Sequence, residues 1–205
     1  MIVEKWWPQH IAYSYYPKHH LIEDELTNHC LNLRKKAYEI GQDNWVSKTY
    51  NSSINLFDDE KFFELNNWVE SQVKLYIKTT GMTFNRKTGE LIELNNNKGG
   101  WYNIYEKHSY QEYHSHASLI SCIYYLKGKE DGAKTIFESP VEEQLGVSYP
   151  ENSDCANGVV FYKPEGGKLL IFRGHTRHCV EQHLSDDLRI TLAYNFNKSN
   201  YTKGL

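Results

Sequence analysis

The chain has 205 residues, of which 40% are hydrophobic and 24% are charged, so it can fold around a core and is not a disordered chain. Its net charge is −3, from 23 basic and 26 acidic residues, and it has no block of Lys and Arg, which excludes the electrostatic pattern of a duplex nucleic-acid binder. No apolar run approaches the length of a membrane span.

Two amphipathic helices are expected in the first part of the chain. Over residues 21–40, apolar side chains recur at spacings of three and four, and Gly41 supplies a stop. Over residues 59–80, a second apolar stripe is followed by Gly81. Both patterns are typical of helices that pack one face against a core. Residues 1–81 are therefore expected to form a helical support region.

After Gly81 the pattern changes to short aromatic and β-branched runs separated by turn residues. Residues 82–85 and 90–94, joined by a turn at 86–89, predict a hairpin. Eight further strands are predicted, at 101–105, 110–116, 119–126, 134–137, 158–162, 168–172, 177–181 and 189–196. Eight short strands imply a sandwich or barrel. We expect a mostly β fold and a single domain over 1–205, with a double-stranded β-helix (jelly roll) over 82–205 buttressed by the N-terminal helices.

One connection is too long for a tight turn. Residues 139–157 contain Pro140, Gly146 and Pro150, which break regular structure. Loops of this length are often lids or binding loops, so we expect this segment to form a lid or the rim of a substrate site.

A His-x-His motif lies in one predicted strand. Because side chains alternate along a strand, residues 112, 114 and 116 point to one face, and the rings of His114 and His116 can converge on one ion. Alone, the motif is weak, since two half-exposed strand histidines would look the same.

A second histidine cluster strengthens the prediction of a metal site. The predicted strand 168–172 turns at Arg173 and Gly174, and His178 then begins the next strand. His178 is the natural third ligand, and His175 in the turn is the competing candidate. Three imidazoles on two strands suit Fe(II), Cu, Ni or Zn.

An arginine near the C-terminus suggests an acidic ligand. Arg189 and Thr191 are two residues apart in the last predicted strand, so they share a face. A guanidinium and a hydroxyl that face inward would clamp a carboxylate. The alternative is an edge arginine paired with Asp186 or Asp187.

With these motifs in order, residues 101–197 resemble the Fe(II)/2-oxoglutarate-dependent dioxygenases, most closely the small bacterial and phage branch and more distantly the prolyl hydroxylases. The shared parts are a Tyr-bearing strand, the His-x-[Asp or His] motif, an aromatic strand, a distal His and Arg-x-Ser/Thr. The resemblance implies that His114 and His178 bind iron and that Arg189, with Thr191, holds the distal carboxylate of 2-oxoglutarate. It also implies hydrogen bonds to the cosubstrate from Tyr125, Tyr105 and Asn103.

The sequence departs from the family at position 116. The family has a carboxylate there, and this chain has His116. Three alternatives follow: His116 ligates the metal, Glu112 on the same strand face replaces it, or two histidines are completed by water or cosubstrate. We favour His116, because strand alternation aims it beside His114.

The resemblance implies an enzyme that uses Fe(II), 2-oxoglutarate and O2 to oxidise a C–H bond, with hydroxylation as the expected outcome, and releases succinate and CO2. Its substrate would be a small molecule, peptide or protein. One rival is a three-histidine cupin that uses no 2-oxoglutarate. Residues 118–125 lack the Glu expected there, and Arg189 would have no role. The other rival is a non-catalytic jelly-roll binding module.

The cysteines bear on the compartment. Cys30, Cys122, Cys155 and Cys179 show no paired motif, and residues 1–18 lack the apolar segment of a signal peptide. Reduced thiols in a cytoplasm are the simple interpretation.

Overall fold

The computed structural model describes residues 9–41, 45–46, 49–85, 89–140 and 158–198. Its larger sheet has seven strands. In spatial order they are β1 (Ile11–Tyr15), β11 (Lys168–Arg173), β8 (Ile120–Lys127), β13 (Arg189–Lys198), β6 (Leu94–Tyr105), β3 (Thr49–Asn51) and β2 (Trp45–Val46). Neighbouring strands are antiparallel throughout this sheet.

A smaller sheet faces the first one. Its four strands, in spatial order, are β10 (Val159–Tyr162), β9 (Thr135–Glu138), β12 (His178–Val180) and β7 (Gln111–His114). The strands from β6 onward divide between the two sheets, with β6, β8, β11 and β13 in the large one and β7, β9, β10 and β12 in the small one. This division is that of a jelly roll, so the predicted fold is confirmed, and each of the eight predicted strands overlaps one of β6–β13.

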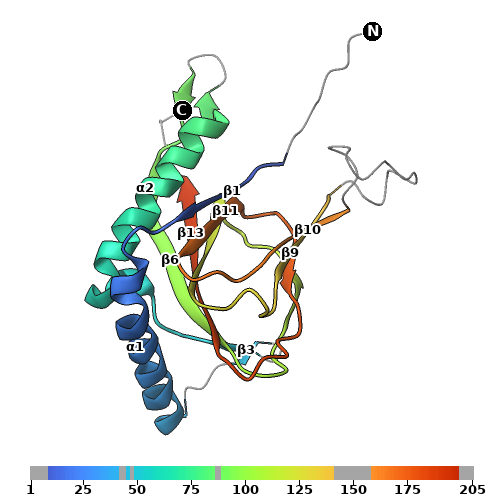
Figure 1. Cartoon of the computed structure of the whole chain (residues 1–205). Coiled ribbons are helices and arrows are strands. Elements are labelled where there is room, and N and C mark those ends of the chain that lie inside the picture. The colour runs from blue at the N-terminus through green and yellow to red at the C-terminus, as the bar shows by residue number, and fades with distance from the viewer. Residues whose placement is uncertain (1–8, 42–44, 47–48, 86–88, 141–157, 199–205) are drawn as a thin grey trace.

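Two helices cover the outer face of the large sheet (Figure 1). They are α1 (His19–Glu39) and α2 (Phe63–Thr80), and the 3-10 turns η1 (Leu56–Asp58) and η2 (Glu60–Phe62) lead into α2. Gly81 ends α2 in the left-handed conformation, with φ 65°, as a helix C-terminal glycine commonly does. In the described part of the chain, neither helix has the length and apolarity that a membrane crossing requires.

The main core lies between these helices and the outer face of the large sheet. Cys30 from α1, Val69 and Val73 from α2, and Tyr124 and Leu192 from the sheet are fully buried in it. Because side chains alternate along each strand, this apolar outer face leaves the opposite face free to line the space between the sheets.

The structure adds elements that the sequence pattern did not reveal. The strands β1, β2 and β3 extend the large sheet at both edges, so residues before Gly81 supply strands as well as helices. The small hairpin of β4 (Thr83–Asn85) and β5 (Glu90–Leu91) agrees with the prediction. The predicted lid falls mostly on residues 141–157, which lie outside the described residues.

Candidate active site

The inner face of the large sheet is organised in rows that the strand register defines. Arg189 on β13 lies opposite Tyr105 on β6. In the next row, Thr191 lies between Asn103 on β6 and Tyr125 on β8. The five residues that the resemblance assigned to the cosubstrate therefore occupy two adjacent rows of one sheet. With the exception of Tyr125, they line a small pocket between the two sheets, with a cavity volume of about 30 Å³.

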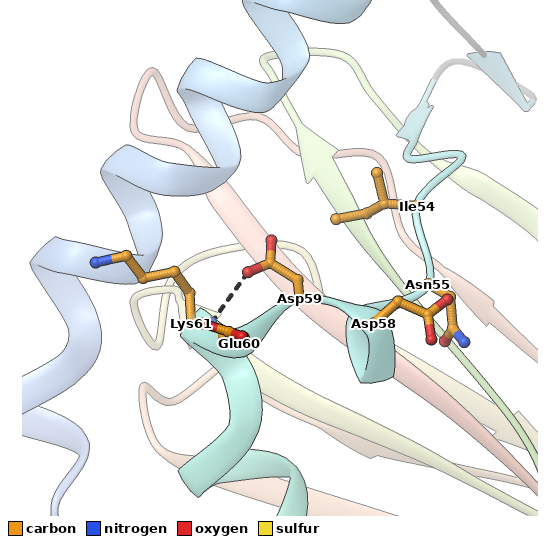
Figure 2. A pocket seen from close by; sticks show the side chains of 6 residues that line it. All are labelled: Ile54, Asn55, Asp58, Asp59, Glu60 and Lys61. Carbon is orange, nitrogen blue, oxygen red and sulfur yellow. Dashed lines mark hydrogen bonds between the residues drawn. The ribbon is translucent and has the colours of Figure 1, made fainter.

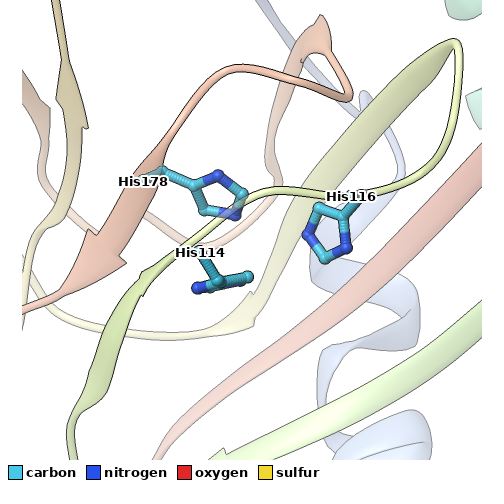
Figure 3. A group of neighbouring side chains, drawn as sticks. All are labelled: His114, His116 and His178. Atoms are coloured by element: carbon cyan, nitrogen blue, oxygen red, sulfur yellow. The ribbon is translucent and has the colours of Figure 1, made fainter.

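Three histidines close the pocket from the side of the small sheet (Figure 3). His178 is the first residue of β12 and pairs in register with His114, the last residue of β7. His116 follows in the next loop. One ligand atom from each residue lies within 4.8 Å of the other two. Two nitrogens that share an ion at about 2.1 Å are at most about 4.2 Å apart, so small ring rotations would bring all three into coordination.

Backbone carbonyls fix the tautomers of two of these rings. Nδ1 of His114 lies 2.8 Å from the carbonyl oxygen of Glu112, and Nδ1 of His178 lies 2.9 Å from that of Thr176. A carbonyl oxygen only accepts, so each Nδ1 donates and each neutral ring keeps its lone pair on Nε2. This is the arrangement that metal-binding histidines ordinarily show.

Burial keeps the imidazole rings of His116 and His178 uncharged. Burial lowers the pKa of His178 to about 3, and the neighbouring His114 adds to the effect. Burial, with His114, also lowers the pKa of His116 to about 4. Both rings are therefore neutral at pH 7, which is the state that binds a metal.

His116 reaches the cluster by a route that differs from the predicted one. The strand was expected to run to residue 116, but β7 ends at His114, so strand alternation does not position His116. Instead, the backbone N–H of His116 donates to the carbonyl of Gly174 at 2.8 Å. Gly174 permits this close approach, because a Cβ there would collide with the carbonyl oxygen of Ser118.

Arg189 is the one fully buried arginine among the described residues, at 1% exposure. Its guanidinium carbon lies 4.3 Å from the ring centre of Tyr105 and 5.3 Å from that of Tyr125. Nη2 donates to Oγ1 of Thr135 at 3.0 Å, while Nε and Nη1 are buried without a partner. Two unused donors on a buried cation are costly, and an anionic ligand in the pocket would satisfy them.

The other predicted cosubstrate residues are buried beside Arg189. The hydroxyl of Tyr105 donates to Gln111 at 2.9 Å, and that of Tyr125 donates to Thr135 at 2.7 Å. Burial raises the pKa of both tyrosines, so both hydroxyls remain protonated. Asn103 donates to Oγ1 of Thr191 at 3.4 Å. In this structure each of these groups bonds within the protein.

The alternative metal ligands and the alternative partners of Arg189 lie outside the pocket. His175 and Glu112 are exposed and are not among the converging side chains. Asp186 pairs with Lys107, and Asp187 pairs with Lys129, so the alternative of an edge salt bridge for Arg189 is wrong.

Three residues in contact with the site were missed by the sequence analysis: Gln111 and Trp101 line the pocket, and Thr135 lies behind Arg189. Thr135 on β9 accepts hydrogen bonds from both Tyr125 and Arg189, and Gln111 accepts one from Tyr105. Trp101 packs 5.6 Å, centre to centre, from the ring of His116. Thr135 and Gln111 lie in predicted strands, but nothing local in the sequence shows that they meet partners from the opposite sheet.

A second hollow lies at the start of α2 (Figure 2). Its lining includes the carboxylates of Asp58, Asp59 and Glu60, and that of Asp59 already has partners within the protein. Asp59 accepts from the backbone N–H of Lys61 and pairs with His29 at 2.7 Å. These contacts cap η2 and join it to α1, so this hollow has a structural explanation.

A comparison with protein families matches the segment that carries the inner pocket. Residues 99–195 match the family described as "Putative 2OG-Fe(II) oxygenase". This segment contains the three histidines, Arg189 and both rows of inner-face residues. A search of curated protein sequences gives no match.

Solved structures share the fold. A Pseudomonas putida prolyl-4-hydroxylase is 15% identical with a TM-score of 0.59, and the alignment covers 94% of each chain. A Trichoplax adhaerens prolyl hydroxylase, in complex with a hypoxia inducible factor peptide, is 16% identical with a TM-score of 0.57, covering 91% of this chain and 83% of the other. HygX from Streptomyces hygroscopicus, with nickel and 2-oxoglutarate bound, is 12% identical with a TM-score of 0.56, covering 96% and 86%.

At these identities the likeness is one of fold. The family match covers the strands that carry the pocket, and the pocket places three histidines that could hold a metal ion next to a buried cation with unpartnered donors. Residues 99–195, just under half of the chain, match the Fe(II)/2-oxoglutarate-dependent oxygenase family, whose members use Fe(II), 2-oxoglutarate and O2.

Proposed function

We propose that the protein is an Fe(II)- and 2-oxoglutarate-dependent oxygenase in which His114, His116 and His178 hold Fe(II). The bound metal supplies the oxidative chemistry that converts 2-oxoglutarate and O2 into succinate, CO2 and an oxidised substrate C–H bond. The chain's own residues prepare that centre. The carbonyls of Glu112 and Thr176 hold two rings with Nε2 available, and the loop contact with Gly174 brings the third ring beside them.

Arg189 would bind the carboxylate of 2-oxoglutarate that lies away from the metal. The observation that carries this proposal is the pair of unpartnered donors, Nε and Nη1, on a fully buried guanidinium in the same pocket as the histidines. A carboxylate accepts two parallel N–H bonds from such a fork. Thr135 holds the third nitrogen, and the rings of Tyr105 and Tyr125 hold the guanidinium plane, so it is positioned before the ligand arrives.

The remaining inner-face residues would orient the cosubstrate and exclude water. Thr191, 2% exposed, and Asn103, 5% exposed, lie in the row next to Arg189. Tyr105 and Tyr125 keep their protons and could rotate from Gln111 and Thr135 to donate to a bound carboxylate. We assign all four to cosubstrate binding.

A small molecule or a peptide fits this proposal, and the Trichoplax prolyl hydroxylase with its bound peptide supports the second option. Hydroxylation is the proposed outcome. The free thiols of Cys30, Cys122 and Cys179 support a reducing compartment, and we propose the cytoplasm.

An anaerobic titration tests the site. Fe(II) and then 2-oxoglutarate are added to metal-free protein, and a visible charge-transfer band is followed. We expect a band in the wild type, no band in His178→Ala, and a weaker band in Arg189→Ala at limiting 2-oxoglutarate. His175→Ala is the matched control, because it removes an exposed imidazole three residues away, and it should leave the band unchanged.

The outcomes separate the proposal from its rivals. Iron binding without the band in the wild type would contradict the assignment of 2-oxoglutarate to Arg189 and would favour the three-histidine cupin. Absence of iron binding would favour a binding module. Unchanged iron affinity in His116→Ala would remove His116 from the metal site while leaving the other assignments intact.

A further inference from the structure

Of the three clustered imidazoles, that of His116 is the one carried by a loop (Figure 3). His114 and His178 pair in register between β7 and β12, so the hydrogen bonds of the small sheet hold both of them. His116 lies in residues 115–119, which connect the end of β7 to the start of β8. The position of its ring therefore depends on what holds this loop.

Backbone hydrogen bonds hold the loop at two of its residues. The N–H of His116 donates to the carbonyl oxygen of Gly174 at 2.8 Å, and the N–H of Gly174 donates to that of Leu119 at 3.3 Å. The N–H of Leu119 donates to the carbonyl oxygen of Phe196 on β13 at 3.0 Å. The part of the loop between these two residues is left to side-chain contacts.

The side chain of Asn195 supplies such a contact. Asn195 lies on the inner face of β13 and lines the same pocket as His116. Its Oδ1 accepts from the hydroxyl of Ser118 in the loop at 3.2 Å and from that of Ser121 on β8 at 2.7 Å. Ser121 is 1% exposed and lies opposite Asn195 in the strand register. Strand pairing therefore positions the amide, and the amide in turn holds the loop.

Ser118 also packs closely against the turn that precedes β12. A Cβ added to Gly174 would lie 2.2 Å from the carbonyl oxygen of Ser118 and 2.4 Å from its hydroxyl oxygen. Ser118 thus contacts both Gly174 and Asn195, and it lies two residues after His116. Because metal ligands must be held to within about 0.5 Å, a loop that loses one of these contacts would misplace its imidazole.

We propose that Asn195 is a positioning residue for the metal site. Through Ser118, it holds the loop where the ring of His116 meets the other two imidazoles. This inference rests on the proposed function, since it takes His116 as a metal ligand. It also connects the two halves of the site, because β13 begins with Arg189 and the same strand would set both the carboxylate anchor and the third metal ligand.

Co(II) alone is the probe, because its visible bands respond to the number and geometry of its nitrogen ligands. Metal-free wild type, Asn195→Leu, His116→Ala and the double variant are titrated with Co(II). Leucine has nearly the volume of asparagine but accepts no hydrogen bond. We expect Asn195→Leu to weaken Co(II) binding by about tenfold and to shift the bands toward those of His116→Ala. In the double variant the two losses should not add, so its affinity should lie within about twofold of that of His116→Ala.

Two further variants test the route from Asn195 to the metal. Ser118→Ala breaks the same hydrogen bond from the loop side, so it should weaken Co(II) binding about as much as Asn195→Leu does. Asn66→Leu is the matched control, because it removes a buried amide on α2 that donates to the carbonyl of Leu56, away from the pocket. It should leave Co(II) affinity unchanged, and thermal unfolding shows that each variant is folded.

The results that would overturn the inference differ from those that would overturn the proposed function. Wild-type affinity and bands in Asn195→Leu would show that the amide does not position the ligand. Fully additive losses in the double variant would show that Asn195 acts on the metal by another route, and an equal loss in Asn66→Leu would show a general effect of lower stability. If the wild type does not bind Co(II), or His178→Ala binds it equally well, the proposed function fails first.

Discussion

The two faces of strand β13 differ in what their side chains do. Toward the helices, Leu192 and Tyr194 are fully buried in the main core. Toward the small sheet, Arg189 and Thr191 are equally buried but polar, and Arg189 has two donors without partners. The outer face stabilises the fold through apolar packing, while the inner face retains unused hydrogen-bonding capacity for ligands. Strand alternation thus separates stability from chemistry within one element.

The largest effect is expected from the outer face. Leu192→Ala removes a fully buried side chain from the main core and should lower the free energy of unfolding by about 2–5 kcal/mol. Urea unfolding measures this loss. The affinity of the folded variant for 2-oxoglutarate should stay the same. A large loss of affinity would show that the two faces are not separable.

The inner face should make stability depend on pH. His116 and His178 have folded pKa values of about 4 and about 3, below the unfolded value of about 6.5, so acid protonates the unfolded chain first. Their contribution is complete above pH 6.5 and is lost as the pH falls toward 4. At pH 5.5 metal-free protein should be about 3 kcal/mol less stable than at pH 7.5 through these two rings.

Urea unfolding at pH 5.5 and pH 7.5 measures this difference in the free energy of unfolding. His116→Asn should reduce the pH-dependent difference by about half, because one of the two titrating rings is gone. A difference that is the same in wild type and variant would contradict the pKa assignment for His116.

Replacing Arg189 should affect binding more than stability. Arg189→Met keeps the length of the side chain but removes the guanidinium, and we expect about 100-fold weaker binding of 2-oxoglutarate, which corresponds to about 2.7 kcal/mol. Loss of the unpaired buried charge offsets the lost bond to Thr135, so the free energy of unfolding without ligand should change by about 1 kcal/mol or less. The shift in melting temperature caused by 2-oxoglutarate reports both quantities. A variant as unstable as Leu192→Ala would contradict the comparison.

The sequence predicted the jelly roll well because its strands are short runs with clear turn residues between them. The strands at the sheet edges were harder. All three residues of β3 are buried, so it shows no alternation. β1 follows the alternation, but its outward residues Tyr13 and Tyr15 are large aromatics with 60% and 49% exposure, and only pairing with β11 explains them.

The candidate site was predictable where spacing within a strand defines it. His114 pairs with His178, and Arg189 faces inward, as the motifs suggested. The position of His116 depends on a hydrogen bond to Gly174, 58 residues away in the chain, and no local pattern encodes it. Thr135 likewise acquires its role only when the small sheet closes over the large one.

The smallest predicted effect is that of two glycine-to-alanine substitutions, which distinguish the cost of backbone conformation from the cost of packing. A Cβ added to Gly81 or to Gly99 would meet no atom within 4 Å, but Gly81 at the end of α2 has φ 65°, while Gly99 on β6 has no positive φ. Gly81→Ala should therefore cost about 1 kcal/mol through the left-handed conformation alone. Gly99→Ala, in a strand, should be neutral or stabilising by about 0.5 kcal/mol, because alanine loses less backbone entropy on folding. Urea unfolding of the two variants side by side measures the difference. Equal losses of stability in the two variants would contradict this explanation. They would mean that Gly99 is required for space beside Asn195, which is its partner in register and lines the pocket. The inner face of the sheet would then be tightly packed at that position.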